Sequence, residues 1–547
     1  MSAAPADRIF VGGRILTQDD DAAPVTALAV TDGLIAAVGG DDVLELRGDR
    51  TEIVDLDGGA LLPGFVDAHL HAVMGGLALL GCDLSTVHSI EDYRRIISDY
   101  AAAHDGPWIE GSGWYGDVFP GGFPTKEELD RLVPDRPAVF ISHDVHSSWV
   151  NSRALEIAGI DRDTPDPDGG RITRDEHGEP TGHLLELATE LLSPYRPHLS
   201  RDLLDAALAA AQQHLHSLGI TAWQDALVGE LFGIPDCYDV YAAASARGEL
   251  VSRVTGALFW VPGRDLADAG ELVDRRDTAG QDRFRTTALK LALDGVCENL
   301  TAALHEPYEG HPHECGLPFF EPDELGAITR LFSDAGFDLH LHAVGDLAVT
   351  RALDAIAAVP RRADARHQVA HIDLIRREDV ARMRGLGAMA NVSPLWARQD
   401  PVLVETKLPL LNADQQERHF LFGSLAGAGV PVAFGSDWPV STPDPIAGLH
   451  TAVNRTAAPG DPHARDRRSR HDPLLAHERL SLDQALRAAT REAARAARLD
   501  EYAGVLRPGR EADLVVLDRD PYGVERSDLG TLRVTQTYVR GALVRGG

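Results

Sequence analysis

The chain has 547 residues, more than one ordinary domain needs and enough for a barrel domain with insertions. Lysine and arginine number 52 together and aspartate and glutamate 84, which gives a net charge of −32 with histidine neutral. This charge repels phosphate backbones and anionic lipid surfaces, so we expect neither a nucleic-acid partner nor a membrane partner. The 44% hydrophobic and 25% charged residues are typical of a soluble globular protein with a large core.

No apolar run approaches the roughly 20 residues of a membrane span. The first residues lack a basic stretch followed by an apolar one, so no secretory signal is predicted, and we expect a cytoplasmic protein. The four cysteines show no CxxC spacing, which predicts free, buried thiols rather than disulfides or a zinc knuckle.

Strand-like runs separated by turn residues occur near both ends of the chain. We therefore expect residues 1–60 and 505–547 to form one small composite β-sandwich domain. In between, residues 61–504 alternate apolar, strand-length runs with helical stretches rich in alanine, leucine and arginine. This alternation predicts repeated βα units around a parallel sheet.

Eight runs in that central region have the length and apolar character of buried strands, and most precede a plausible helix. Eight βα units predict an α/β fold, a (β/α)₈ TIM barrel, whose active site lies at the C-terminal ends of its strands. An open doubly wound sheet is the structural alternative, but the first βα turn lacks the glycine pattern that binds phosphates. The runs are 61–71, 219–226, 253–260, 288–295, 337–344, 367–374, 388–394 and 430–437.

About 150 residues separate the first two runs, far more than an ordinary βα loop contains. We assign residues 72–200 to an insertion that covers the strand ends, and we expect it to select the substrate. One strand-like run is visible in it, at 136–142. The candidates for contact with a small organic ligand, each of which could equally pack the lid, are Trp114, Tyr115, His143, His146 and Trp149. Outside the insertion, Arg398 is a candidate for bidentate binding of a substrate carboxylate.

Metal-competent side chains occur at the ends of several predicted strands. His69 and His71 are two residues apart on the first strand, so both imidazoles project to one face. His342, His371 and Asp437 end the fifth, sixth and eighth strands. Each residue alone fits a core histidine or a capping aspartate, but in a barrel these ends converge on one mouth. Nitrogen and carboxylate ligands together suit zinc or another divalent first-row metal.

Lysine is rare: only Lys126, Lys290 and Lys407 accompany 49 arginines. In this chain arginine fills almost every position that needs only a positive charge. We therefore expect Lys290, in the fourth apolar strand, to perform chemistry that arginine cannot. Burial and a nearby dication would favour its neutral amine, which can add carbon dioxide to give a carbamate that bridges two metal ions. The alternative is a partly buried lysine paired with Asp294 or Glu298.

These residues lie in a set of motifs that runs from about residue 11 to residue 518. The chain resembles the metal-dependent amidohydrolase superfamily, specifically its amidohydrolase-3 branch of YtcJ-like and N-substituted-formamide-deformylase-like proteins. The motifs are PGFVDAHLH, GWYGDVFP, DVHSSWVNSRAL, KLALDG, HAVGD, RHQVAHIDLI, GSDWPV and LRPGREADLVVLD.

The resemblance implies a barrel with a binuclear site, expected to hold two Zn²⁺ ions per chain, and a CO₂-derived carbamate on Lys290 as the bridge. The motif places a ligand at His342 rather than at the neighbouring His340, which we expect to lie inside the barrel. The implied ligands are His69, His71 and Asp437 for one ion and His342 and His371 for the other.

The implied reaction is hydrolysis of a non-peptide C–N bond in an amide, N-formyl or cyclic amide substrate of small size. The metal pair would lower the pKa of a bridging water, and Asp437 would take its proton and pass it to the leaving nitrogen. Two alternatives remain open: a mononuclear amidine deaminase that uses His69, His71, His342 and Asp437, and a catalytically silent binding protein on the same barrel. A homodimer is the default expectation for a soluble enzyme of this size.

Overall fold

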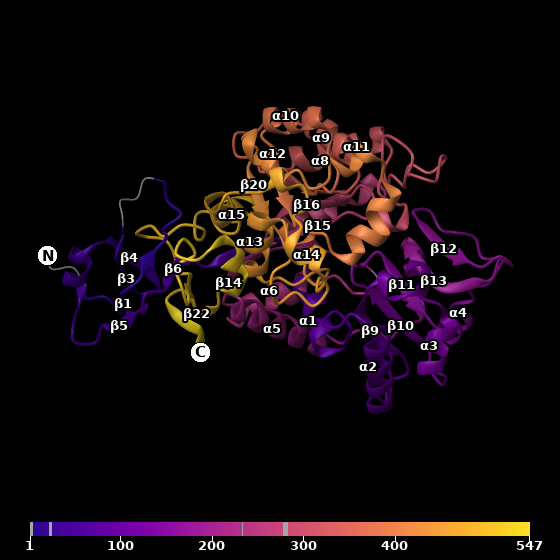
Figure 1. Cartoon of the computed structure of the whole chain (residues 1–547), viewed down its shortest axis with the longest axis horizontal. Coiled ribbons are helices and arrows are strands. Elements are labelled where there is room, and N and C mark those ends of the chain that lie inside the picture. Colours follow the sequence, from indigo (N-terminus) through magenta and orange to yellow (C-terminus); the bar gives the residue numbers. More distant parts are fainter. Residues whose placement is uncertain (1–3, 21–24, 232, 277–282, 547) are drawn as a thin grey trace.

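The computed structural model of the chain describes residues 4–20, 25–231, 233–276 and 283–546. At its centre, eight parallel strands pair in chain order and curl into a barrel (Figure 1). Each predicted strand run overlaps one of them, so the predicted (β/α)₈ barrel is confirmed. The strands are β7 (Phe65–Leu70), β14 (Ile220–Val228), β15 (Arg253–Phe259), β16 (Phe284–Ala292), β17 (Asp338–Ala343), β18 (Gln368–His371), β19 (Met389–Val392) and β20 (Val432–Phe434).

Hydrogen bonds between β7 and the segment after β20 close the ring. The Asp437 amide donates to the His69 carbonyl at 2.7 Å, and the His71 amide donates to the Trp438 carbonyl at 2.8 Å. The side-chain amide of Asn391 in β19 adds a bond of 2.9 Å to the Ala68 carbonyl. The first and last strands therefore meet at their C-terminal ends.

Helices pack around the barrel, and α8 shows why the sequence forms them. Pro322 occupies the first turn, where its missing N–H is no loss. Leu325, Ile328 and Phe332 then follow at helical spacing and are buried against the strands, at roughly 2 kcal/mol for each side chain. The helices of the barrel layer are α1 (Ala72–Leu80), α5 (Arg201–Ser217), α6 (Tyr238–Ala246), α7 (Ala269–Arg275), α8 (Pro322–Asp334), α9 (Asp346–Ala358), α10 (Arg377–Leu386), α12 (Phe422–Gly427), α13 (Pro445–Asn454), α15 (Leu482–Ala488) and α16 (Arg491–Ala496).

The run at 61–71, predicted as one strand, is divided at Gly64 between two sheets. β6 (Ala60–Pro63) pairs with β21 (Leu514–Leu517) outside the barrel, and β7 begins immediately after the glycine. A Cβ at Gly64 would lie 2.2 Å from the Thr221 hydroxyl, so only glycine fits where the chain passes from one sheet to the other.

Strands from both termini lie at one end of the molecule (Figure 1). A four-stranded sheet has the order β4-β3-β1-β5, and a five-stranded sheet has the order β2-β6-β21-β22-β23. Phe10 and Tyr538 meet edge to face at 5.2 Å between strands from opposite ends of the sequence. The strands not yet bounded are β1 (Arg8–Val11), β2 (Arg14–Ile15), β3 (Ala27–Thr31), β4 (Leu34–Gly39), β5 (Glu52–Asp55), β22 (Val534–Val539) and β23 (Ala542–Gly546).

The insertion between β7 and β14 forms a six-stranded sheet of order β12-β13-β11-β10-β9-β8, at the opposite end of the molecule (Figure 1). Only β10 was visible as an apolar run, because strands such as β9, with sequence IEGSGW, have no apolar alternation. The elements are β8 (Cys82–Asp83), α2 (Ile90–Ala103), β9 (Ile109–Trp114), α3 (Lys126–Leu132), β10 (Ala138–Ser142), β11 (Ser147–Val150), α4 (Ser152–Ala158), β12 (Gly170–Arg174) and β13 (Pro180–Glu186).

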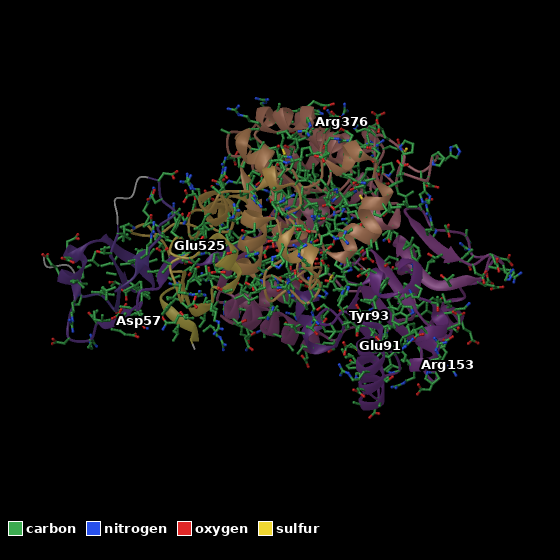
Figure 2. All side chains as sticks on the ribbon, viewed as in Figure 1. Asp57, Glu91, Tyr93, Arg153, Arg376 and Glu525 are labelled. Carbon is green, nitrogen blue, oxygen red and sulfur yellow. The ribbon has the colours of Figure 1, made fainter. Side chains whose placement is uncertain are left out.

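Charged side chains such as Glu91 and Arg153 cover the outside of this insertion, whereas Tyr93 on α2 is buried (Figure 2). Three of the cysteines are buried and free, but Cys315 is half-buried, so the expectation of four buried thiols is wrong at that position. Cys315 lies in an irregular segment between β16 and α8. Among the described residues, no helix has both the length and the apolar character needed to cross a bilayer.

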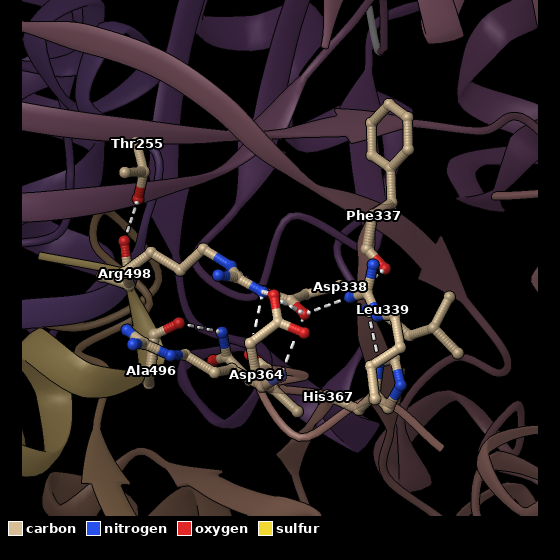
Figure 3. A network of polar contacts seen from close by, with 12 residues as sticks. Thr255, Phe337, Asp338, Leu339, Asp364, His367, Ala496 and Arg498 are labelled. Atoms are coloured by element: carbon tan, nitrogen blue, oxygen red, sulfur yellow. Dashed lines mark hydrogen bonds and ion pairs between the residues drawn. The ribbon is translucent and has the colours of Figure 1, made fainter. Parts of the chain in front are cut away.

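A polar network links the N-terminal ends of barrel strands to the segment after α16 (Figure 3). Asp338, the first residue of β17, accepts hydrogen bonds from the Arg498 guanidinium, from Arg362 at 3.1 Å and from the Arg366 amide at 2.9 Å. Thr255 at the start of β15 bonds the Ala497 carbonyl at 2.9 Å. These bonds attach the segment after α16 to two strands, at the face of the barrel that serves stability rather than catalysis.

Candidate metal centre

Three predicted ligands meet where the first and last strands join. His69 is the penultimate residue of β7, His71 follows that strand, and Asp437 follows β20. Asp437 Oδ1 lies 3.3 Å from His69 Nε2 and 3.1 Å from His71 Nε2. The three ligand-type atoms lie within 4.8 Å of one another, and all three side chains are buried. This arrangement can hold one divalent ion.

The second predicted pair adjoins the first group. His342 in β17 and His371 at the end of β18 have ring centroids 4.5 Å apart. His371 Nδ1 lies 3.9 Å from Asp437 Oδ2, so the two carboxylate oxygens of Asp437 face the two groups of imidazoles. The structure thus brings His69, His71, His342, His371 and Asp437 to one edge of the barrel.

Left-handed backbone conformations occur at two of these strand ends. His371 has φ of 74° and Asp437 has φ of 59°. Such conformations cost a non-glycine residue about 1–3 kcal/mol and cluster at functional sites. Two of the fourteen described non-glycine residues with positive φ are thus side chains predicted to bind metal.

The chemistry of the imidazoles fits a metal ion. His71 Nδ1, His342 Nε2 and His371 Nδ1 are buried and have no hydrogen-bond partner among the described residues, which is costly unless another group takes their lone pairs. Burial, with Lys290 nearby, lowers the pKa of His69 to about 3, and burial likewise holds those of His342 and His371 well below the usual range. Neutral imidazole is the form that binds metals.

Lys290 in β16 belongs to the same cluster. Its side chain is 4% exposed, and Nζ lies 3.4 Å from His69 Nε2. Burial lowers its pKa to about 8, against the opposing effects of Asp437 and Asp225. The alternative partners are engaged elsewhere: Asp294 accepts the amides of Ala303, Val344 and Gly345, and Glu298 pairs with Lys407 at 3.3 Å.

Two supporting contacts at the centre have no obvious sequence signal. Asp67 Oδ1 accepts the amides of His69 and Ser436, both at 3.0 Å, and so joins β7 to the segment that carries Asp437. His340, buried inside the barrel, lies with Nε2 2.9 Å from His69 Nδ1. That bond orients the His69 ring, with Nε2 directed toward Asp437.

A cavity of about 410 Å³ lies beside the centre, within the range of sites for small organic molecules. His342, His371 and Asp437 line it from the barrel, and Tyr115, His143 and His146 line it from the insertion. The insertion therefore forms part of the cavity wall.

The five aromatic and imidazole candidates in the insertion divide into two groups. Tyr115 stacks on His143 at 3.9 Å, and both reach the cavity with His146. Trp114 and Trp149 instead pack in the core of the insertion, where their indole N–H groups donate to the Phe140 and Thr125 carbonyls at 2.8 Å.

Arg398 lines the cavity, but its guanidinium is already paired. It lies 3.0 Å from Asp400 and 2.8 Å from Asp461, and it also donates to the Leu395 carbonyl. The charge expected to bind a substrate carboxylate is therefore neutralised within the protein. Asp461 lies far along the chain from Arg398, so sequence alone could not show this pairing.

Two further ion pairs at the cavity wall were not predicted from the sequence. His146 Nδ1 lies 2.6 Å from Glu186 Oε2, and although burial opposes it, Glu186 raises the pKa of His146 to about 9. Lys407 lies between Asp373 at 2.7 Å and Glu298 at 3.3 Å. The scarcity of lysine was a signal for Lys407 as well as for Lys290, although a role was predicted only for Lys290.

Comparison with known proteins agrees with this architecture. The chain matches the Amidohydrolase family over residues 52–545. It is 29% identical to YtcJ of Bacillus subtilis, over 98% of this chain and 99% of that one, and 29% identical to the N-substituted formamide deformylase of Arthrobacter pascens, over 98% of each. A solved structure, an uncharacterized metal-dependent hydrolase from Pyrococcus horikoshii OT3, aligns with a TM-score of 0.72 at 26% identity, covering 95% of this chain and 99% of that chain. The chain therefore belongs to the amidohydrolase family.

Proposed function

We propose that this protein is a metal-dependent hydrolase that cleaves the C–N bond of a small amide, N-formyl amide or cyclic amide. One observation carries the proposal: five candidate ligands and Lys290 converge at the barrel mouth beside a cavity sized for a small molecule. The N-substituted formamide deformylase of Arthrobacter pascens, similar along nearly its whole length, supports the choice of bond.

The residues suited to hold metal form two sets. His69, His71 and Asp437 would hold one ion, and His342 and His371 a second, with Lys290 between them as a carbamate. Forming that carbamate joins the neutral amine of Lys290 to carbon dioxide and releases one proton. Bound divalent ions, with zinc the expected metal, would polarise the substrate carbonyl and lower the pKa of water at the site.

Asp437 is the residue placed to move a proton. Burial alone would raise its pKa, but His69 and His71 beside it hold the pKa well below the usual range, so the carboxylate is ionised and can accept a proton. Its Oδ2 reaches toward His371 and the cavity. Asp437 would take the proton of the attacking water and deliver it to the departing nitrogen.

A single-ion deamination at an amidine carbon is the second candidate. The close grouping of His69, His71 and Asp437 favours it, since these three would hold one ion without a bridge from Lys290. A count of metal ions per chain separates the two candidates.

The test is hydrolysis of a panel of amides, N-substituted formamides and lactams by the metal-loaded protein. We expect turnover of at least one class, loss of it on metal removal, and recovery with zinc. If the metal-loaded protein turns over no member of the panel, C–N hydrolysis is rejected and a binding role on the same barrel is favoured.

A further inference from the structure

The charged side chains that line the cavity are unbalanced. Among the described lining residues there are eight carboxylates, Asp437 included, and two arginine or lysine side chains, Arg398 and Lys407. Apart from Asp437, which belongs to the metal centre, the wall still carries more negative than positive charge. Away from the metal centre, where bound ions would add positive charge, a wall of this kind repels anionic groups and attracts cationic ones.

Both cations of the wall are held between pairs of carboxylates. Arg398 lies within 3.0 Å of Asp400 and 2.8 Å of Asp461. Lys407 lies within 2.7 Å of Asp373 and 3.3 Å of Glu298. Each group of three therefore has a net charge of −1, and in the described wall neither cation is left to bind a substrate carboxylate.

A charge on His146 would be balanced in the same way. Its Nδ1 lies 2.6 Å from Glu186 Oε2, and the other oxygen of Glu186 accepts the Thr301 hydroxyl at 2.6 Å. His146 is thus part of a third internally paired group on the cavity wall, contributed by the insertion.

The group around Lys407 also has unused acceptors. Asp373 is 1% exposed and lines the cavity, and its Oδ1 has no hydrogen-bond partner among the described residues. Glu298 Oε2, also in the lining, lacks one as well. Buried acceptors without donors are costly, and a donor group of the ligand that reaches Asp373 Oδ1 or Glu298 Oε2, the oxygens that Lys407 does not contact, would satisfy them.

We propose that the cavity selects substrates whose end away from the scissile bond carries a positive charge, an ammonium or guanidinium group, which binds at Asp373 and Glu298 beside Lys407. This inference rests on the proposed C–N hydrolysis for its substrate and names the chemical class of that substrate. The inference also reverses the role expected of Arg398. The cavity wall around Arg398 would exclude a substrate carboxylate instead of binding it.

The experiment compares three N-formyl alkylamines of equal chain length that end in an ammonium, a methyl or a carboxylate group. We expect kcat/KM to be about tenfold or more higher for the ammonium than for the methyl compound, and lowest for the carboxylate. The preference should shrink at high ionic strength, because salt screens charges that are not fully enclosed. Equal values for the three compounds, or the highest value for the carboxylate, would overturn the inference.

Glu298→Gln removes one charge from the wall without touching the metal centre and should reduce the preference for ammonium over methyl. The matched control is Glu176→Gln on the outer surface of the insertion, where the side chain is 86% exposed, and it should leave the preference unchanged. An unchanged preference in Glu298→Gln contradicts the assigned position.

A binding measurement separates this inference from the proposed reaction. Calorimetric titration with an alkylammonium and with an alkylcarboxylate of equal length needs no turnover. If none of the three formamides is hydrolysed but the ammonium binds and Glu298→Gln weakens it, charge selection stands and C–N hydrolysis fails. If the formamides are hydrolysed but the carboxylate binds as tightly as the ammonium, hydrolysis stands and charge selection fails.

Discussion

His71 Nε2 lies 3.1 Å from Asp437 Oδ1, a contact that joins the first strand of the barrel to the segment after the last. Both residues are buried, and the backbone amide of His71 is bonded to Trp438, the neighbour of Asp437. The same closure of the barrel that stabilises the fold therefore assembles the candidate metal centre.

Replacement of Asp437 by asparagine keeps the size of the side chain but removes the carboxylate. We expect kcat to fall about a hundredfold or more, because the amide cannot accept the proton that Asp437 would move. Steady-state kinetics on the metal-loaded variant measures this, with circular dichroism to show that the fold is retained. Wild-type turnover in Asp437→Asn would remove Asp437 from the mechanism.

Lys290→Ala removes the amine that would carry the carbamate. We expect the metal content to fall by about one ion per chain and turnover to fall with it, since neither alanine nor water supplies a bridging carboxylate. A small carboxylic acid that enters the vacated space should restore part of both. Unchanged metal content in Lys290→Ala would favour the single-ion candidate.

Asp67→Ala tests the bond that positions the centre. The change leaves the amides of His69 and Ser436 without an acceptor in a buried place, which we expect to cost about 2–5 kcal/mol. Denaturant unfolding measures the loss. Asp105→Ala, at an exposed loop position, is the control and should change the free energy of unfolding by less than about 0.5 kcal/mol.

Much of this architecture was predictable because the signals are local. Apolar runs of strand length identified all eight barrel strands, and the alternation with helices identified the barrel. The metal candidates His69, His371 and Asp437 followed because a polar side chain at the end of a buried strand is costly unless a ligand or a partner compensates it. Their convergence needed only the knowledge that strand ends meet at one mouth.

The partners of charged groups were not predictable, because they depend on contacts between distant segments. Arg398 was expected to bind a substrate carboxylate, but it forms an ion pair with Asp461, which lies in a loop remote in sequence. Trp149 was a candidate for ligand contact, but the insertion buries it in a core of its own, which includes strands such as β9 that have no apolar alternation. Composition could not distinguish a tryptophan in that core from one in the cavity.

The two groups of insertion residues predict separable effects. Trp149→Phe removes the hydrogen bond to the Thr125 carbonyl and part of a buried ring, and should lower stability by about 1–3 kcal/mol with little change in KM. His146→Gln, in the cavity wall, should change kcat/KM, in addition to the stability that is lost when buried Glu186 loses its partner. Thermal unfolding and kinetics on both variants measure this, and a KM change in Trp149→Phe alone would contradict it.

Stability should fall as the pH drops, partly through His216. Burial lowers the pKa of His216 to about 4 from 6.5, and its Nε2 lies 2.8 Å from the Ser252 hydroxyl. Between pH 6.5 and pH 4, His216 is therefore protonated in the unfolded chain but neutral in the folded chain. The stabilisation that is present above pH 6.5 is lost as the pH falls toward 4. From about pH 7.5 to pH 5 the loss is about 2 kcal/mol. Denaturant unfolding of His216→Gln should show a smaller difference than the parent between these two pH values, and an equal difference would exclude His216 as a source.

The measurement that tests the central claim most directly is elemental analysis of the protein combined with assay of the same samples on its best C–N substrate. We predict two divalent ions per chain in the active protein, no turnover after complete chelation, and recovery in proportion to the zinc restored. Full turnover by protein shown to contain no metal would contradict the assignment of His69, His71, Lys290, His342, His371 and Asp437 as a metal centre.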